Sequence, residues 1–206
     1  MQGLGKCSIP TDRGFTLVEL MVVVGLIALV MTQGIPWLES TTLNSRRAAQ
    51  INAFVADLNA ARGLAVAGDD VTFGVHGINP CTGCEVSLCK TEDGATCSTS
   101  SSVYWENGWL LFWDADGDGV VDTVDNDRLI AVRPALTGGN TLRGNILVRH
   151  RVTYTTSGFT SNNGSLAWCD KRGFGDQARA IVIASTGRVR TAAINDASVS
   201  LVSCSP

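Results

Sequence analysis

The chain has 206 residues, of which 45% are hydrophobic and 17% are charged, and its formal net charge is −3. This length fits one ordinary domain, and a charged fraction below the roughly 25% of soluble proteins excludes a coiled-coil rod or a highly charged disordered tail. The net negative charge argues against a chain that is basic overall and binds nucleic acid in that way. Seven cysteines indicate either a metal site or an oxidising compartment.

An almost uninterrupted apolar run, Phe15–Met31, follows a short polar leader and has a single charge, Glu19. Its length is near the lower limit of about 17–25 residues for a membrane-spanning helix. The A-x-A-like site of a secretory signal peptide is missing after the run, so we expect the run to stay in the mature protein. An acid inside such a run is costly, which favours a functional role for Glu19 over an ordinary membrane anchor.

The residues Arg13–Val22, RGFTLVELMV, resemble the processing motif of type IV pilins and pseudopilins. The resemblance implies that a prepilin peptidase removes the leader 1–14 by cutting after Gly14 and then methylates the new N-terminal Phe15. It also implies that Glu19 pairs with the N-terminal amine of a neighbouring subunit during assembly. A buried glutamate would be costly without such a partner, so the pairing would favour one register between subunits.

The same resemblance implies where each part of the mature chain lies. The segment 15–36 is expected to rest in the inner membrane and later to pack in the core of a filament, with Pro36 loosening the helix. The remainder, 37–206, is expected to be a globular domain in the periplasm and then on a cell-surface pilus or pseudopilus. The implied partners are prepilin peptidase, the inner membrane and other pilin subunits.

After Pro36, apolar residues recur at spacings of three and four, which predicts that the helix continues to about residue 67. The stripe consists of Ile51, Phe54, Val55, Leu58, Ala61, Leu64 and Ala65. Short apolar segments separated by Gly, Asn or Asp then predict mostly antiparallel strands. These are Val71–Val75, Val103–Trp105, Trp109–Trp113, Arg128–Val132, Asn145–Tyr154, Ser165–Cys169, Ala180–Ala184, Arg188–Ala193 and Ser198–Val202. The predicted fold is α+β: a long N-terminal helix, half inserted in the membrane, packed on a pilin-like antiparallel β-sheet domain.

Six cysteines remain after cleavage, because Cys7 lies in the leader. An even number in an exported domain favours disulfides, and six cysteines allow fifteen connectivities. The resemblance to minor pilins pairs Cys169 with Cys204. The other four would then staple the loop around them: Cys81, Cys84, Cys89 and Cys97. The alternative is a zinc knot made by those four residues.

The segment Asp114–Asp125 resembles a calcium-binding loop, with Gly at position 6 and acids at positions 1, 3, 5, 9 and 12. The expected ligands are Asp114, Asp116, Asp118, Asp122 and Asp125. Position 12 departs from the usual glutamate, and the preceding segment is predicted as a strand instead of a helix. The alternative is a solvated turn without metal, and no other cofactor is expected.

Charge is divided unevenly along the mature chain. Residues 15–127 contain four basic and 15 acidic side chains, whereas residues 128–206 contain ten basic and three acidic ones. This asymmetry indicates an anionic partner, unless the basic half simply neutralises the acidic turn. If Arg188 begins a strand, Arg188 and Arg190 share one face, and their planar guanidinium groups suit neighbouring phosphates.

Nearly the whole domain is similar to minor pilins of the FimT/GspH type, through Gly108–Phe112, Leu166–Asp170 and a late Gly-Arg-x-Arg segment. In FimT-type members this segment is implicated in binding DNA during natural transformation. The resemblance thus implies double-stranded DNA as a partner. The residues it implies are Gly187, Arg188 and Arg190, with Arg179, Lys171 and Arg172 as outlying contacts. The alternative is a structural pseudopilin of type II secretion, or a primer of pilus assembly, that binds no DNA.

Enzymatic chemistry is not expected. The two histidines, His76 and His150, stand alone, and GxSxG, HExxH and P-loop motifs are missing from the sequence. Each histidine is expected to be a surface or strand residue.

Overall fold

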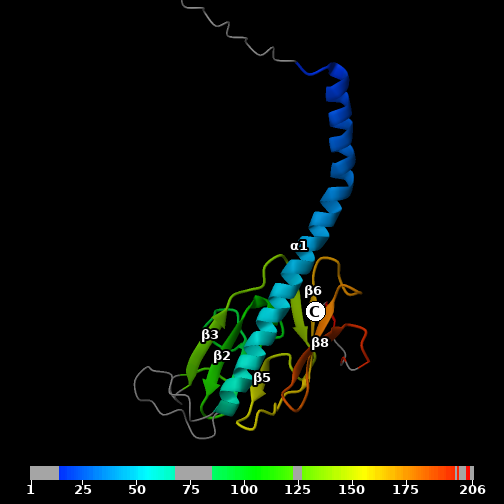
Figure 1. Ribbon diagram of the computed structural model, residues 1–206. Helices are drawn as coiled ribbons and strands as arrows, with labels where there is room; N and C mark the ends of the chain where they lie inside the picture. The colour runs from blue at the N-terminus through cyan, green and yellow to red at the C-terminus, as the bar shows by residue number, and fades with distance from the viewer. Residues whose placement is uncertain (1–13, 68–84, 123–126, 198, 200–202, 205–206) are drawn as a thin grey trace, which may run out of the picture. The chain divides into compact units, whose positions relative to one another are not determined.

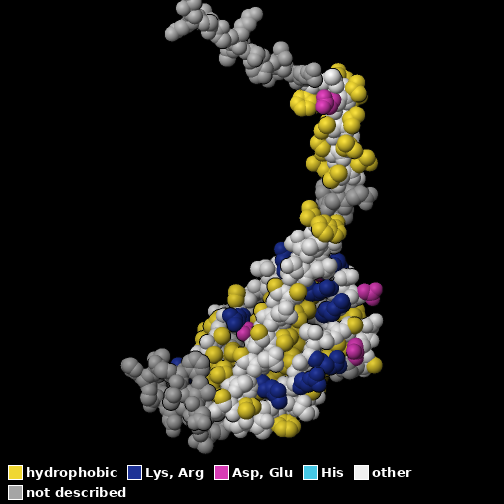
Figure 2. All heavy atoms as spheres, viewed as in Figure 1, with side chains coloured by type: hydrophobic (Ala, Val, Ile, Leu, Met, Phe, Trp, Pro, Cys, Tyr) yellow, Lys and Arg dark blue, Asp and Glu magenta, His cyan; other side chains and the backbone are white. Residues whose placement is uncertain are grey.

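The computed structural model describes residues 14–67, 85–122, 127–197, 199 and 203–204. The chain divides into two compact units, Met1–Asn44 and Ser45–Pro206. One helix, α1 (Leu17–Ala67), contributes to both. In the first unit its apolar side chains are exposed, from Leu17 at 73% to Leu38 at 58%, and Figure 2 shows them covering the visible face.

In the second unit, two four-stranded antiparallel sheets pack against α1 (Figure 1). The first sheet has the order β3-β2-β1-β5, and the second has the order β4-β6-β7-β8. The first contains β1 (Glu85–Lys90), β2 (Trp109–Asp114), β3 (Arg128–Arg133) and β5 (Arg151–Tyr154). The second contains β4 (Thr141–Gly144), β6 (Gly164–Cys169), β7 (Arg179–Ile183) and β8 (Val189–Ala193). A 3-10 helix, η2 (Trp105–Asn107), precedes β2.

One hydrophobic core joins the helix to both sheets. Phe54 of α1 packs edge-on against Trp105 and Trp109, with ring centroids 5.3 and 5.0 Å apart. Five residues of the predicted helical stripe are buried: Ile51, Phe54, Leu58, Ala61 and Ala65. A helix turns once in 3.6 residues, so spacings of three and four place these side chains on the face that meets the sheets. The α+β fold predicted from the sequence is confirmed.

Two strand predictions are wrong. Val103–Trp105 is not a strand, because Trp105 begins η2 and donates its indole N–H to the carbonyl of Val148. Asn145–Tyr154 is not one strand, because a turn closed by Val148 N–H and the Asn145 carbonyl leaves only β5 at its end. Two strands, β1 and β4, were not predicted. Val71–Val75 and residues 198 and 200–202 of the last predicted strand lie outside the described residues.

Candidate functional site

The segment that carries the processing motif opens α1. Gly14 and Phe15 precede the helix and are exposed, and Glu19 lies in its first turn. The Thr16 hydroxyl accepts the backbone N–H of Glu19 at 3.2 Å, which satisfies one of the donors that a helix start leaves unpaired. An acid in the first turn also interacts favourably with the helix dipole. The segment therefore presents a folded, apolar helix start with one carboxylate.

Polar side chains between the apolar positions of α1 anchor the helix to the loops and strands of the second unit. Arg47 Nη1 donates to the carbonyl of Gln177 at 2.8 Å. Gln50 donates to the carbonyl of Thr137 at 3.0 Å, and its own side-chain oxygen accepts from Asn140 Nδ2 at 2.7 Å. The sequence identifies these residues as polar positions of a helix, but it does not predict their hydrogen-bond partners.

Asp57 is the most buried of these anchors, with 4% of its surface exposed. Its carboxylate accepts the indole N–H of Trp109 at 2.9 Å and two hydrogen bonds from Arg133, at 2.9 and 2.8 Å. These hydrogen bonds raise the pKa of the Arg133 guanidinium. Asp57 thus joins the helix to β2 and β3 at the same point.

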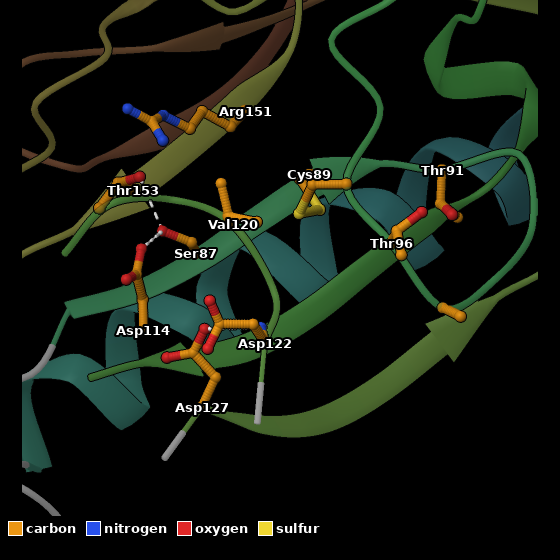
Figure 3. Close-up of a disulfide and its surroundings, with 12 residues drawn as sticks. Ser87, Cys89, Thr91, Thr96, Asp114, Val120, Asp122, Asp127, Arg151 and Thr153 are labelled. Carbon is orange, nitrogen blue, oxygen red and sulfur yellow. Dashed lines mark hydrogen bonds between the residues drawn. A yellow bond between two sulfur atoms is a disulfide. The ribbon is translucent and has the colours of Figure 1, made fainter. Parts of the chain in front are cut away.

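The acidic turn after β2 begins with Asp114, which is fully buried. The hydroxyl of Ser87 donates to Asp114 Oδ2 at 3.0 Å and lies 2.7 Å from the hydroxyl of Thr153 (Figure 3). Burial raises the pKa of Asp114 to about 6. Carboxylate oxygens of Asp114, Asp116 and Asp127 lie within 4.8 Å of one another.

Backbone N–H groups already satisfy these carboxylates. Asp114 accepts from Gly117 N at 2.8 Å, and Asp127 accepts from the backbone N–H groups of Ala115 and Asp122 at 2.8 and 3.1 Å. The grouped acids differ from the predicted set, because Asp127 joins Asp114 and Asp116. Asp118 and Asp122 fall outside the group, and Asp125 lies outside the described residues. Calcium binding stays a prediction.

Two disulfides lie within the described residues. Cys89 of β1 is bonded to Cys97 in the loop that follows, and Cys169 at the end of β6 is bonded to Cys204. The second bond joins the two cysteines that the resemblance to minor pilins pairs. A zinc knot of four thiolates does not fit the first bond, because Cys89 and Cys97 are bonded to each other. Cys81 and Cys84 lie outside the described residues.

The predicted DNA-binding residues fall into two groups at opposite ends of the β7–β8 hairpin. Gly187 and Arg188 lie in its turn, and β8 begins one residue later than predicted, at Val189. Arg188 is exposed, whereas Arg190 is partly buried, with its Nη1 3.8 Å from a carboxylate oxygen of Asp196. Val189 packs against the core, so Arg190 lies on the other face of β8, whereas Arg188 precedes the strand and does not begin it as predicted.

The second group surrounds the loop between β6 and β7. Arg172 forms a close ion pair with Asp170, and Arg179 Nη1 donates to the backbone carbonyls of Asp176 and Ala178 at 2.6 and 2.8 Å. Lys171 is exposed. Since Arg179 pairs with the fifth residue after Arg188 in the β-ladder, the two groups are about 16 Å apart along the hairpin. The structure therefore does not bring the six residues into one cluster.

The basic half is neutralised in part by acids outside the Asp-rich turn. Arg133 pairs with Asp57 of α1, and Arg143 pairs with Glu106 of η2 at 2.7 Å. Arg151 does reach the acidic turn, where it donates to the backbone carbonyl of Asp118. Among the described residues, the acids of residues 15–127 that form ion pairs with arginines of residues 128–206 thus lie in α1 and η2. Arg188 at the hairpin turn is exposed.

His150 lies just before β5, and its Nδ1 is buried without a hydrogen-bond partner. Burial lowers the pKa of this imidazole, and the positive charges of Lys90 and Arg149 lower it further. His76 lies outside the described residues. The environment of His150 favours the neutral imidazole, which agrees with a structural role for this residue.

This environment makes the stability of the protein depend on pH. The unfolded chain binds a proton at His150 more readily than the folded chain, so the contribution of His150 to the free energy of unfolding should fall as the pH drops below about 6.5. Asp114, whose pKa is raised, contributes with the opposite sign in both proteins, so the difference between the original protein and His150→Gln should isolate the loss due to His150. Urea denaturation of both proteins at pH 7.5 and 5.5 measures the difference, and parallel pH profiles would contradict the assignment.

Comparison with known proteins identifies the class of molecule. A family model described as type II transport protein GspH matches residues 50–187, and a model of the prokaryotic N-terminal methylation motif matches residues 10–32. Among solved structures, the type IV minor pilin FimU of Pseudomonas aeruginosa PAO1 is similar, with 19% identity and a TM-score of 0.48. The match covers 75% of this chain and 91% of that chain. A search of curated proteins finds no match.

An apolar N-terminal helix behind a methylation motif, joined to a helix-and-sheet domain, defines a pilin or pseudopilin subunit. The chain belongs to the GspH family, whose model covers two thirds of its length. This family is structural, so the chain is not an enzyme, and its partners include other pilin subunits. Among the described residues, α1 is the one helix that is long and apolar enough to cross a membrane.

Proposed function

We propose that the chain is a minor subunit of a type IV pilus. One observation carries the proposal: the apolar run Phe15–Met31 is exposed and has a single acid, Glu19, four residues after the predicted new N-terminus. Such a surface needs a bilayer or other apolar helices to cover it. Before assembly the helix would span the inner membrane with the second unit in the periplasm. After assembly it would pack in the filament core.

Replacing Glu19 with Ala tests this role. Membrane insertion should persist, because the substitution removes the one charge in the apolar run. Incorporation into filaments should fall about tenfold or more, because the N-terminal amine of the neighbouring subunit would be buried without a counter-charge. Quantitative immunoblots of sheared filaments and of membrane fractions measure both. Glu39→Ala, in the same helix, is the matched control, and unchanged incorporation of Glu19→Ala would refute the role.

We further propose that the hairpin turn with Gly187 and Arg188 binds the phosphate backbone of DNA, as in natural transformation. Exposure of Arg188 and the excess of ten basic over three acidic residues in 128–206 support this proposal. Arginine suits phosphate because its planar fork can donate two hydrogen bonds. The second candidate is a structural pseudopilin of type II secretion without DNA binding, which the description of the family model favours.

The double substitution Arg188→Gln with Arg190→Gln separates these two candidates. Binding of the full chain to duplex DNA should weaken to a similar extent for every sequence tested, because phosphate contacts carry no sequence information. Affinity of the original protein should also fall steeply with salt. Fluorescence anisotropy at two salt concentrations measures both effects, with Arg128→Gln on β3 as the matched control. If the double variant bound DNA as tightly as the original protein, the DNA-binding proposal would fail and the structural pseudopilin would be the favoured candidate.

A further inference from the structure

A single arginine of α1 ties together two turns that are distant in sequence. Arg62 Nε donates to the carbonyl of Gly158 at 3.0 Å, and its Nη2 donates to the carbonyl of Thr186 at 3.3 Å. The first carbonyl belongs to the turn 155–159, between β5 and β6, and the second to the turn 184–188, between β7 and β8. The helix therefore fixes both turns through one guanidinium group.

The backbones of the two turns are in direct contact. Thr160 N–H donates to the carbonyl of Ser185 at 3.1 Å. Gly187 has a φ of 76°, and a Cβ atom at this position would lie 2.1 Å from the carbonyl oxygen of Gly158. Only glycine accepts both the left-handed backbone and this close approach. The glycine of the Gly-Arg-x-Arg segment is thus required for joining the turns.

The joined turns present an aromatic ring and a cation to solvent. Phe159 is 54% exposed, and Arg188 is exposed immediately after the contact glycine. Asp and Glu are missing from residues 154–169 and 177–195, which contain both turns.

We propose that these joined turns bind single-stranded DNA, with Phe159 stacked on an unpaired base and Arg188 contacting a phosphate. This inference rests on the proposed DNA-binding function and specifies its substrate class. An exposed ring gains stacking energy from the face of a base, and in a duplex neighbouring base pairs cover that face. A positive side chain beside an aromatic one is the combination that holds single strands without reading their sequence.

The rigidity of the turns strengthens this assignment. A site that is already ordered loses little conformational entropy when it binds a flexible strand. Arg62 and the Gly187–Gly158 contact supply this order independently of any ligand. Stacking on one aromatic residue is worth about 5- to 150-fold in affinity, so removal of the ring should be measurable on single strands.

The test compares two DNA forms with five proteins: the original chain, Phe159→Ala, Phe159→Tyr, Phe174→Ala and Arg188→Gln. The full chain in phosphatidylcholine nanodiscs is titrated with a fluorescein-labelled thymidine 20-mer and with a duplex of equal length, at fixed salt. Phe159→Ala should weaken binding of the single strand at least about fivefold and binding of the duplex less than twofold. Phe159→Tyr should restore single-strand binding. Phe174→Ala is the matched control, because Phe174 is 57% exposed in the β6–β7 loop and should change neither affinity.

The outcomes separate the inference from the proposed function. If Arg188→Gln weakens binding of both DNA forms and Phe159→Ala weakens neither, the stacking role is wrong and DNA binding survives. If Phe159→Ala weakened binding of the single strand and of the duplex equally, the stacking role would also be wrong. Phe159 would then act by maintaining the conformation of the turns. If the original protein binds neither DNA form, the inference and the proposed DNA binding fail together.

Discussion

Replacing Asp57 with Ala should destabilise the second unit by about 1–4 kcal/mol. The substitution leaves the indole N–H of Trp109 buried without an acceptor, which costs about 1–3 kcal/mol. It also removes both hydrogen bonds of Arg133, whose side chain is 49% exposed and therefore adds about 1 kcal/mol or less. Urea denaturation followed by tryptophan fluorescence measures the free energy of unfolding, because Trp109 itself reports the loss of structure.

Two further variants show whether the effect comes from these hydrogen bonds. Asp57→Asn keeps one side-chain oxygen for the indole of Trp109 and should cost less than Asp57→Ala. Asp176→Ala removes an exposed acid and should stay within about 0.5 kcal/mol of the original protein. If Asp57→Ala were as stable as Asp176→Ala, Asp57 would not anchor the helix.

Replacing Phe54 with Ala should destabilise the protein by about 3–5 kcal/mol. Phe54 is 1% exposed and is held edge-on by Trp105 and Trp109, so its removal opens a cavity between α1, η2 and β2. Packing between aromatic rings adds to the cost beyond the buried area. The same denaturation experiment measures the loss, and near-ultraviolet circular dichroism should show weaker tryptophan signals.

The neighbouring residue provides the control for this substitution. Val55 lies one position further along α1 and is only partly buried, so Val55→Ala should cost clearly less than Phe54→Ala. Equal losses would mean that the helix as a whole, and not the aromatic contact, determines stability. A loss below about 1 kcal/mol for Phe54→Ala would show that the core closes around the missing ring.

The sequence predicts what repeats or alternates along the chain. The stripe from Ile51 to Ala65 was predicted because helical spacing is visible in one segment, and the ends of β2 and β6 were predicted to within one residue. The strand β1 was missed because its sequence, EVSLCK, mixes apolar and polar residues within a cysteine-rich loop. Its five residues after Glu85 are buried, since β1 lies between β2 and β5.

The contacts of polar residues could not be predicted in the same way. A sequence shows that Asp57 and Arg62 are charged, but their partners come from β2, β3 and two turns as many as 124 residues away. The acids that gather after β2 differ from the predicted set for the same reason. Folding of the turn brings Asp127 close to Asp114, although the two are 13 positions apart in the sequence. The predicted DNA-binding arginines do not form one cluster for the same reason. Arg188 and Arg179 lie at opposite ends of the β7–β8 hairpin, and the sequence does not show this separation.

The anchors along α1 have a mechanical consequence for a subunit in a filament under tension. Arg47, Gln50, Asp57 and Arg62 hold the helix at successive levels over about 22 Å, and each reaches a different loop or strand. A pull applied along the helix axis would load these contacts together, in shear, instead of opening them one after another. The β-sheet domain would therefore resist being stripped from its helix far better than the strength of any single contact implies.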